Sequence, residues 1–190
     1  MNKSLVAMLG LLLALSACAA EPDATTLSPL KVDLDDVVAN GVVQPVDGIT
    51  AAGQPDEAAL KVFADSGYAA VIDLRTDGEA RGLDEPAVVE RLGMDYVSLP
   101  ITGDGISFDN ARTLDELIKG YEGPVLVHCG SSNRVGALLA LRASLEGADD
   151  SAALEAGKEG GLTGLEGKVR DVLATCLLYT SPSPRDRSAY

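Results

Sequence analysis

A short apolar strand that runs directly into a small-residue loop and then a long helix is the most constraining feature of the sequence. Residues 125–127 form the apolar run, residues 128–134 form the loop, and helical spacing of apolar residues continues until Gly147. A wholly apolar run of this length is typical of a strand buried on both faces, as in the middle of a parallel sheet. The segment therefore predicts an α/β fold with this strand inside the sheet.

The chain between residues 42 and 175 alternates short apolar runs with helical patterns, which is the signature of α/β units. We expect a short, largely parallel central sheet flanked by helices. Asp56 is predicted to cap the first helix, Gly67 to end it, and Asp109 to cap a later helix. Strands are predicted over residues 42–46, 68–74, 96–101 and 125–127, and helices over residues 57–66, 85–92, 110–119, 135–145, 151–157 and 165–175.

The N-terminal residues have the plan of a secretory signal. Asn2 and Lys3 precede an apolar run that is too short to span a bilayer comfortably and that closes on Leu15-Ser16-Ala17-Cys18. This ending resembles a bacterial lipobox, so residues 1–18 are predicted to be a lipoprotein signal peptide with Cys18 lipidated. The alternative is an ordinary signal that is cleaved after an Ala-x-Ala-like site.

Residues 19–41 are predicted to be a linker that tethers the domain outside the cytoplasm. Ala19 stands where an inner-membrane retention signal would place Asp, which favours the periplasmic side of the outer membrane. At the other end, residues 176–190 resemble a translated sequencing-library adaptor. We therefore expect a folded domain over residues 42–175, followed by a non-native tail in place of the native C-terminus. A genuine disordered tail is the alternative.

Charge and cysteine content narrow the classes of function. The chain has 29 acidic and 15 basic residues and a formal net charge of -14. Such a surface repels phosphate backbones, which argues against nucleic-acid binding over the whole surface. With Cys18 in the signal and Cys176 in the tail, Cys129 is the one thiol left to the domain, so no intramolecular disulfide can form. A lone thiol in an oxidising compartment is either buried and inert or retained for its chemistry.

The loop around Cys129 has the composition of an anion site. A strand that ends in small residues and opens a helix directs loop amides and the helix N-terminus at one point, and both favour the thiolate of Cys129 as a nucleophile. Arg134 supplies a planar fork suited to two oxygens of a phosphoryl group. His128 is predicted to hydrogen-bond the backbone and hold the loop, not to act as a base. The small loop residues that admit the oxyanion are Gly130, Ser131, Ser132 and Asn133. The alternative is a buried, inert Cys129 followed by a solvated Arg134.

Four ordered motifs extend this pattern over the domain. They are Gly53-Gln54-Pro55, Asp73-Leu74-Arg75 with Glu79, Leu99-Pro100-Ile101, and His128-Cys129 with Arg134. Together they resemble the bacterial beta-lactamase hydrolase-like phosphatase family, within the cysteine-dependent tyrosine and dual-specificity phosphatases. The resemblance implies a dual-specificity-phosphatase-like fold and a phospho-cysteine intermediate without metal or other cofactor. It also implies a phosphorylated small molecule or phosphoprotein as the partner.

The resemblance further implies a general acid on the loop after the third strand. Asp104, between two glycines that would let the loop move, is the best candidate, and an ordinary turn aspartate is the alternative. Arg75 is expected to pair with Asp73 or Glu79 and to shape the rim of the site.

Two departures from the better-known phosphatases keep other functions open. Those enzymes have five residues between Cys and Arg, whereas the four here match rhodanese-type sulfurtransferases, so transfer of sulfur through a Cys129 persulfide is one alternative. They also place Ser or Thr after the Arg, where this chain has Val135. A module that binds oxyanions without turnover is therefore a second alternative.

Overall fold

The computed structural model describes residues 37, 39–40, 44–46 and 49–180, with side chains for residues 37 and 49–175. All of these lie in one compact unit that begins at Lys31. The predicted signal with Cys18, most of the predicted linker and residues 181–190 lie outside the described residues. Among the helices of the described part, none is long and apolar enough to cross a membrane.

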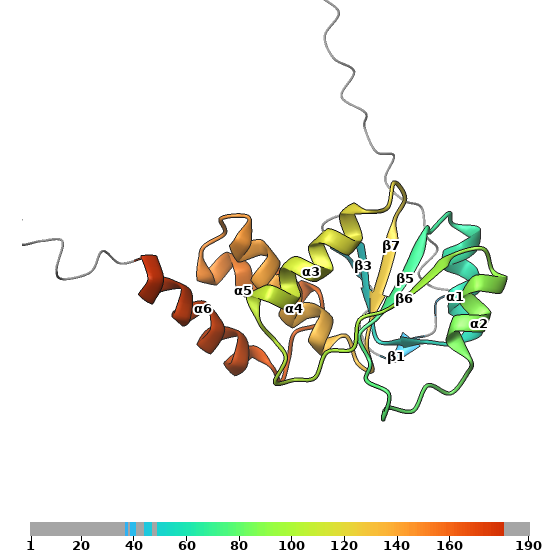
Figure 1. The fold of residues 1–190 in the computed structure, drawn as a ribbon, viewed down its shortest axis with the longest axis horizontal. Helices are drawn as coiled ribbons and strands as arrows, with labels where there is room; N and C mark the ends of the chain where they lie inside the picture. The colour runs from blue at the N-terminus through green and yellow to red at the C-terminus, as the bar shows by residue number, and fades with distance from the viewer. Residues whose placement is uncertain (1–36, 38, 41–43, 47–48, 181–190) are drawn as a thin grey trace, which may run out of the picture. The chain divides into compact units, whose positions relative to one another are not determined.

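A five-stranded sheet in the order β2-β3-β7-β5-β6 forms the middle of the domain (Figure 1). Its edge strand β2 is antiparallel to β3, whereas β3, β7, β5 and β6 are parallel. The strands are β2 Gln44–Val46, β3 Ile49–Ala52, β5 Ala70–Asp73, β6 Asp95–Ser98 and β7 Val125–His128. A separate antiparallel pair joins β1 Ala39–Asn40 to β4 Gln54–Pro55. The prediction that the apolar run at residues 125–127 lies inside a largely parallel sheet is confirmed.

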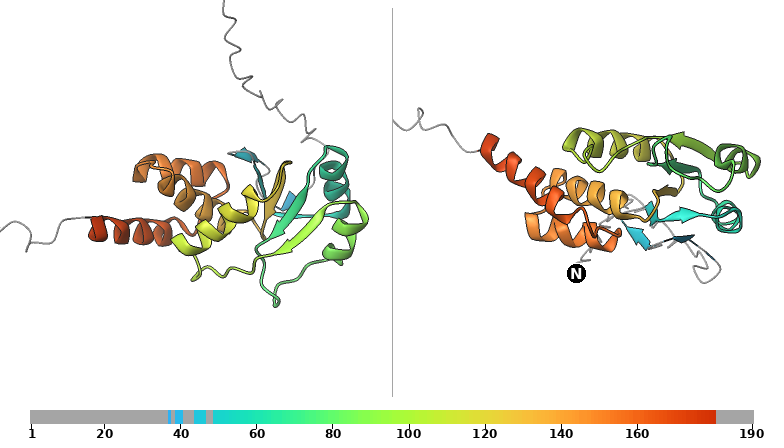
Figure 2. Two further views of the ribbon diagram at one scale, coloured as in Figure 1. Left: turned by 45° about the horizontal axis from the view of Figure 1, so that its top comes forward. Right: turned by 90° about the horizontal axis from the view of Figure 1, so that it is seen from below.

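The six helices of the described residues flank this sheet in two groups (Figures 1 and 2). On one face lie α1 Glu57–Asp65 and α2 Glu85–Arg91. On the other lie α3 Phe108–Lys119 and α4 Asn133–Leu145, and α5 Asp150–Glu159 and α6 Glu166–Thr180 pack against α4. Because successive strand residues point to opposite faces, Leu126 packs into the core under α1 and α2, and Val127 into the core under α4. The flanked-sheet fold is confirmed, although α6 continues past the expected domain end at residue 175.

The register of the parallel strands gathers the predicted motifs at one edge. Ala52 and Asp73 both lie opposite His128, and Ser98 lies opposite Asp73. The loops that follow β3, β5, β6 and β7 therefore leave the sheet side by side, as is usual for ligand sites in parallel sheets.

The ends of α1 and α3 test the helix boundaries predicted from the sequence. Asp56 caps α1, accepting a hydrogen bond of 2.8 Å from the Ala59 amide, and Gly67 follows the helix with φ 82°, so both predictions are confirmed. The prediction that Asp109 caps the next helix is wrong. Ser107 precedes α3 with an extended backbone, and its hydroxyl accepts from the Asn110 amide, so Asp109 falls within the first turn.

The predicted strand over residues 42–46 corresponds to β2, but β3 was not predicted. Its sequence Ile-Thr-Ala-Ala has little strand preference after its first two residues. All four residues are buried between β2 and β7, so tertiary packing makes this segment a strand where its own composition does not.

Candidate active site

The loop that begins at Cys129 is tied to the chain after β3. The Cys129 side chain is 1% exposed, and its sulfur is a free thiol. Its amide donates to the Ala52 carbonyl over 3.3 Å, and Ser131, which is exposed, forms a β-bridge with Gly53. The Gly53-Gln54-Pro55 motif therefore adjoins the Cys129 loop.

Ser132 gives the loop its turn into α4. Its φ of 62° is the one positive value at a non-glycine position among the described residues, and its Oγ donates to the Gly160 carbonyl over 2.8 Å. Ser132 precedes α4 without a side-chain cap bond to it. The amides of the first turn of α4 therefore stay available to an anion in the loop.

Arg134 is brought to Cys129, as predicted. Its Nη1 donates to Glu79 Oε1 at 2.7 Å and its Nη2 donates to Glu79 Oε2 at 2.5 Å, and the side chain lies near enough to Cys129 for their charges to interact. Nη1 also donates to the Ile101 carbonyl at 3.0 Å. The hydrogen bonds with Glu79, and the charges of Cys129 and Glu79, raise the pKa of Arg134. The guanidinium is thus a cation held in a fixed orientation beside the Cys129 loop.

Glu79, which the sequence offered as a possible partner of Arg75, instead pairs with Arg134 and orients its guanidinium. The hydrogen bond from Arg134, with further bonds from the Thr76 amide and hydroxyl to Oε1, lowers the pKa of Glu79 to about 2. A Cβ at Gly130 would lie 3.7 Å from Glu79 Oε2 and 3.8 Å from Arg134 Nη2. The ion pair therefore lies beside the first residue of the loop interior.

The Asn133 side chain hydrogen-bonds residues outside the Cys129 loop. Its Oδ1 accepts hydrogen bonds from the Thr163 amide at 2.8 Å and the Leu165 amide at 3.3 Å, both in the connection between α5 and α6. The side chain predicted to bind an oxyanion thus anchors this connection. The Asn133 amide, at the start of α4, is the group left for an anion.

Asp104 is exposed at the tip of a short turn after β6. The Gly105 amide donates to the Thr102 carbonyl over 3.1 Å, and Asn110 Nδ2 donates to the Gly105 carbonyl. Ile101 and Ile106, which flank the turn, are buried. Because Arg134 donates to the Ile101 carbonyl, the residue just before this turn is attached to the first turn of α4. The role of Asp104 as general acid stays a prediction.

Arg75 pairs with Asp73, which is one of the two partners predicted for it. Nε and Nη2 donate to the two Asp73 oxygens at 2.9 Å each, and Nη2 also donates to Glu85 Oε2. The prediction that Arg75 shapes the rim is wrong, because its side chain is fully buried with both carboxylates. Burial alone would raise the pKa of Asp73, but hydrogen bonds from Arg75 and Tyr96 and the charge of His128 lower it.

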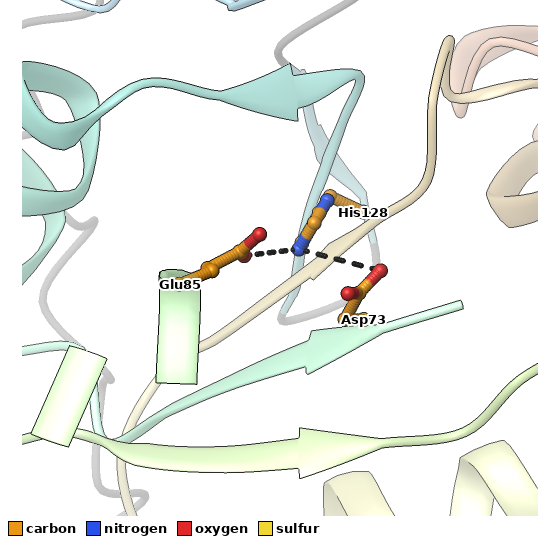
Figure 3. A group of neighbouring side chains, drawn as sticks. All are labelled: Asp73, Glu85 and His128. Carbon is orange, nitrogen blue, oxygen red and sulfur yellow. Dashed lines mark ion pairs between the residues drawn. The ribbon is translucent and has the colours of Figure 1, made fainter. Parts of the chain in front are cut away.

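His128 faces this buried network and not the loop backbone, which corrects the predicted role. Its Nε2 lies 2.6 Å from Glu85 Oε1 and 3.8 Å from Asp73 Oδ1 (Figure 3). Its Nδ1 has no hydrogen-bond partner among the described side chains and backbone. Strand alternation explains the difference, since residue 128 points toward α2 and residue 129 toward the opposite face. Glu85 was missed because a first-turn acid after Asp84 has the sequence pattern of an exposed one.

Asp73, Glu85 and His128 each offer a possible metal-ligand atom, and these atoms lie within 4.8 Å of one another. However, the Arg75 guanidinium hydrogen-bonds both carboxylates. Asp73 Oδ2 also accepts from Arg81 Nη1 and the Tyr96 hydroxyl, at 2.8 Å each. A metal ion would be repelled by these two guanidinium groups. The cluster is therefore an ion-pair network that joins β5, β7 and α2 beneath the site.

Comparison with known proteins places this geometry in a family. Residues 44–146 match the family described as beta-lactamase hydrolase-like protein, phosphatase-like domain. The chain is 34% identical over 110 residues to the beta-lactamase hydrolase-like protein of Xylella fastidiosa strain Temecula1, which covers 56% of this chain and 26% of that protein. The chain thus spans about a quarter of the length of this curated relative.

Solved structures share the fold. A DUF442 protein from Shewanella putrefaciens CN-32 superposes with a TM-score of 0.58 at 20% identity, covering 76% of this chain and 93% of that one. A cysteine-to-serine variant of P. aeruginosa TpbA, solved in complex with phosphotyrosine, gives a TM-score of 0.50 at 20% identity, covering 70% and 95%. The predicted dual-specificity-phosphatase-like fold is confirmed. From the match over residues 44–146, the chain belongs to the beta-lactamase hydrolase-like protein, phosphatase-like domain family.

Proposed function

We propose that this chain is a phosphatase that hydrolyses a phosphate monoester through a phospho-cysteine intermediate on Cys129. The observation that carries the proposal is the placement of Cys129 and Arg134 on the loop that opens α4, with Glu79 orienting the guanidinium beside Gly130 of that loop. Membership of a phosphatase-like domain family supports it. The phosphotyrosine complex of P. aeruginosa TpbA supports a phosphorylated small molecule or phosphoprotein as the ligand.

The reaction has two displacements at phosphorus. The Cys129 thiolate attacks phosphorus and the bond to the leaving oxygen breaks, while the loop amides and Arg134 stabilise the charge on the equatorial oxygens. Asp104 gives its proton to the leaving oxygen. Water then attacks phosphorus, Asp104 takes the water proton, and the thiolate leaves as inorganic phosphate forms. Val135, which is fully buried, provides no hydroxyl to assist this departure.

The first test is hydrolysis of an aryl phosphate by the full chain under reducing conditions with a metal chelator. We expect chelator-resistant turnover that is lost in Cys129→Ser. A Cys129→Ser protein that hydrolyses as fast as the parent would overturn the proposal. A folded parent that binds phosphate tightly without turnover would favour an oxyanion-binding module instead.

The role of Asp104 as general acid can be tested by substitution, with the nearby Asp109 as a matched control. Asp104→Asn should lower kcat/KM for a substrate with a poor leaving group by about 10²-fold, the usual contribution of a general acid. Asp109→Asn changes another exposed aspartate, in the first turn of α3, and should keep the parent rate. Equal losses in the two variants would remove Asp104 from the mechanism.

The four-residue loop interior, Gly130 to Asn133, favours sulfur transfer as the second candidate. In that reaction the Cys129 thiolate takes the outer sulfur of thiosulfate, and sulfite leaves. The measurement is the mass of the intact protein after thiosulfate treatment. A gain of one sulfur atom that is absent in Cys129→Ser would support this candidate, and an unchanged mass would count against it.

We further propose that the chain is lipidated at Cys18 and faces the periplasm from a bacterial membrane, with the outer membrane favoured. The support is the Leu15-Ser16-Ala17-Cys18 ending of the apolar run and Ala19 after it. Radiolabelled palmitate should be incorporated by the parent and not by Cys18→Ala, and the variant should leave the membrane fraction. Labelling that persists in Cys18→Ala would overturn lipidation at this residue.

A further inference from the structure

The connection between α5 and α6, residues 160–165, lies against the Cys129 loop. Ser132 Oγ donates to the Gly160 carbonyl, and Asn133 Oδ1 accepts from the Thr163 and Leu165 amides. Two adjacent residues of the Cys129 loop therefore hold both ends of this short connection.

Close backbone packing restrains the connection further. A Cβ at Gly136, in the first part of α4, would lie 2.3 Å from the Leu162 nitrogen and 2.4 Å from the Gly157 carbonyl oxygen. The absence of a side chain at residue 136 lets the backbones of α4 and the connection meet directly. The connection is thus set relative to α4 by backbone contact as well as by hydrogen bonds.

The far side of the connection reaches the turn that carries Asp104. The Leu165 side chain is partly buried against the core cluster that contains Ile101 and Ile106. Its Cδ2 lies 3.4 Å from the position that a Cβ at Gly103 would take. Leu165 therefore packs on the residue immediately before Asp104.

We infer that Leu165 is a positioning residue that holds the turn of residues 102–105, and with it Asp104, in place relative to Cys129; this rests on the proposed function, in which Asp104 is the general acid. The contacts run from Asn133 through the Leu165 amide to its side chain, and from there to Gly103. A second attachment, from Arg134 to the Ile101 carbonyl, holds the start of the same turn. That attachment does not involve Leu165. Shortening Leu165 should therefore loosen the turn while Ile101, at its start, stays bound to Arg134.

The first experiment tests the contact without any assay of activity. Amide hydrogen exchange, followed by mass spectrometry, compares the parent with Leu165→Ala. Val172→Ala is the matched control, because Val172 is a partly buried apolar residue that packs on the same core from α6. We expect exchange over residues 102–105 to become faster by about tenfold in Leu165→Ala and to stay at the parent rate in Val172→Ala. Unchanged exchange in Leu165→Ala, or an equal increase in both variants, would overturn the inference.

The second experiment uses the dependence on the leaving group, which a merely structural residue does not alter. Loss of a general acid slows the hydrolysis of aryl phosphates whose leaving phenol has a high pKa. It has little effect when the leaving phenol has a low pKa. Leu165→Ala should therefore lower kcat/KM for phenyl phosphate by about tenfold, and for 4-nitrophenyl phosphate by less than about twofold. Val172→Ala should slow neither substrate.

A double variant separates this inference from the proposed function. If Leu165 acts through Asp104, adding Leu165→Ala to Asp104→Asn should cost no further rate. Additive losses of kcat/KM in the double variant, or an equal loss on both substrates in Leu165→Ala, would overturn the inference. The proposed function would still stand if hydrolysis depends on Cys129. Hydrolysis that survives Cys129→Ser would overturn the function, and the exchange measurement would still decide whether Leu165 holds the turn.

Discussion

At the scale of single residues, the bidentate pair with Glu79 fixes the plane of the Arg134 guanidinium. Nη1 and one hydrogen of Nη2 are used on protein oxygens, so in the proposed reaction the ligand meets the edge formed by Nε and the second Nη2 hydrogen. A lysine ammonium is a point charge and cannot supply two parallel hydrogen bonds to an oxyanion while holding Glu79.

Arg134→Lys should therefore lower kcat/KM for an aryl phosphate by about 10²-fold to 10³-fold, the effect of losing an oxyanion donor. Arg142→Lys is the matched control, since Arg142 lies on the same helix and pairs with Asp115. That variant should keep the parent rate. An Arg134→Lys protein within about threefold of the parent would contradict a directional role for the guanidinium.

The stability contributed by Glu79 should depend on pH. Since folding lowers the pKa of Glu79 to about 2 from its ordinary value of 4.5, the pair with Arg134 stabilises the fold above about pH 4.5. That contribution is lost as the pH falls toward 2. Because the side chain is one-third exposed, solvent screening reduces the contribution to about 1 kcal/mol. Urea unfolding at pH 6 and at pH 3 should find Glu79→Gln less stable than the parent at pH 6, with the difference shrinking at pH 3. A difference that is the same at both pH values would contradict this origin.

The buried network predicts a large cost for removing one charge. Arg75→Met leaves Asp73 and Glu85 without their shared cation in a fully buried site, and breaking such a pair costs about 3–5 kcal/mol of unfolding free energy. Arg91→Met removes an exposed arginine that pairs with Glu57, and should cost no more than about 1 kcal/mol. Urea titration of both variants measures the two values. Similar costs would mean that the network contributes little beyond a surface pair.

At the scale of elements, the contact between α4 and the chain from Gly157 to Leu162 leaves no room for a side chain at residue 136. Gly136→Ala forces backbone atoms apart and should destabilise the fold by about 3 kcal/mol, at the upper end of overpacking costs. Gly167→Ala, inside α6, meets nothing within 4 Å and should be neutral or stabilising by up to about 1 kcal/mol. Thermal unfolding should separate the two variants. A Gly136→Ala protein as stable as the Gly167→Ala protein would contradict the close packing.

The parts of the fold that could be predicted from the sequence are those with strong local signals. The strand, loop and helix around Cys129 follow from one continuous stretch, which is why the proximity of Cys129 and Arg134 was predictable. The helix cap at Asp56 has the same local character. By contrast, β3 is a strand because β2 and β7 pair with it, and only the first two of its four residues favour a strand.

The partners of the charged side chains could not be predicted for a related reason. Asp73, Arg75 and Glu79 lie close together in the sequence, so either acid could pair with Arg75. The choice depends on the register of β5 against β7, which brings Asp73 opposite His128, and on Arg134 of α4 taking Glu79. Such choices belong to tertiary structure and leave no periodic pattern in the chain.

At the scale of the whole molecule, the site extends beyond the part of the chain that matches the family. The match ends at residue 146, whereas Ser132 and Asn133 have their partners between residues 160 and 165. Helix α4 is buried from Val135 to Arg142, with α5 and α6 packed beside it. The last two helices are therefore part of the same folded domain as the candidate site.

A chain that ends at Gly147 should accordingly lose cooperative unfolding and aryl phosphate hydrolysis together, because α4 would expose its apolar side chains. A chain that ends at Thr180 retains every described contact of residues 49–175 and should unfold at the midpoint of the full chain. Circular dichroism during urea titration measures both. A cooperative, active chain ending at Gly147 would show that α5 and α6 are dispensable.

The order of strands has a consequence for how this domain is made. Among the described strands β7 is the last to be synthesised, yet it lies between β3 and β5, which are not neighbours without it. Until residue 128 leaves the ribosome, both earlier strands present unpaired edges, and such edges recruit other chains. Insertion of the strand that carries the nucleophile is thus the event that closes the sheet. Substitutions that weaken this insertion should first reduce the yield of soluble protein, while the molecules that do fold keep their full specific activity.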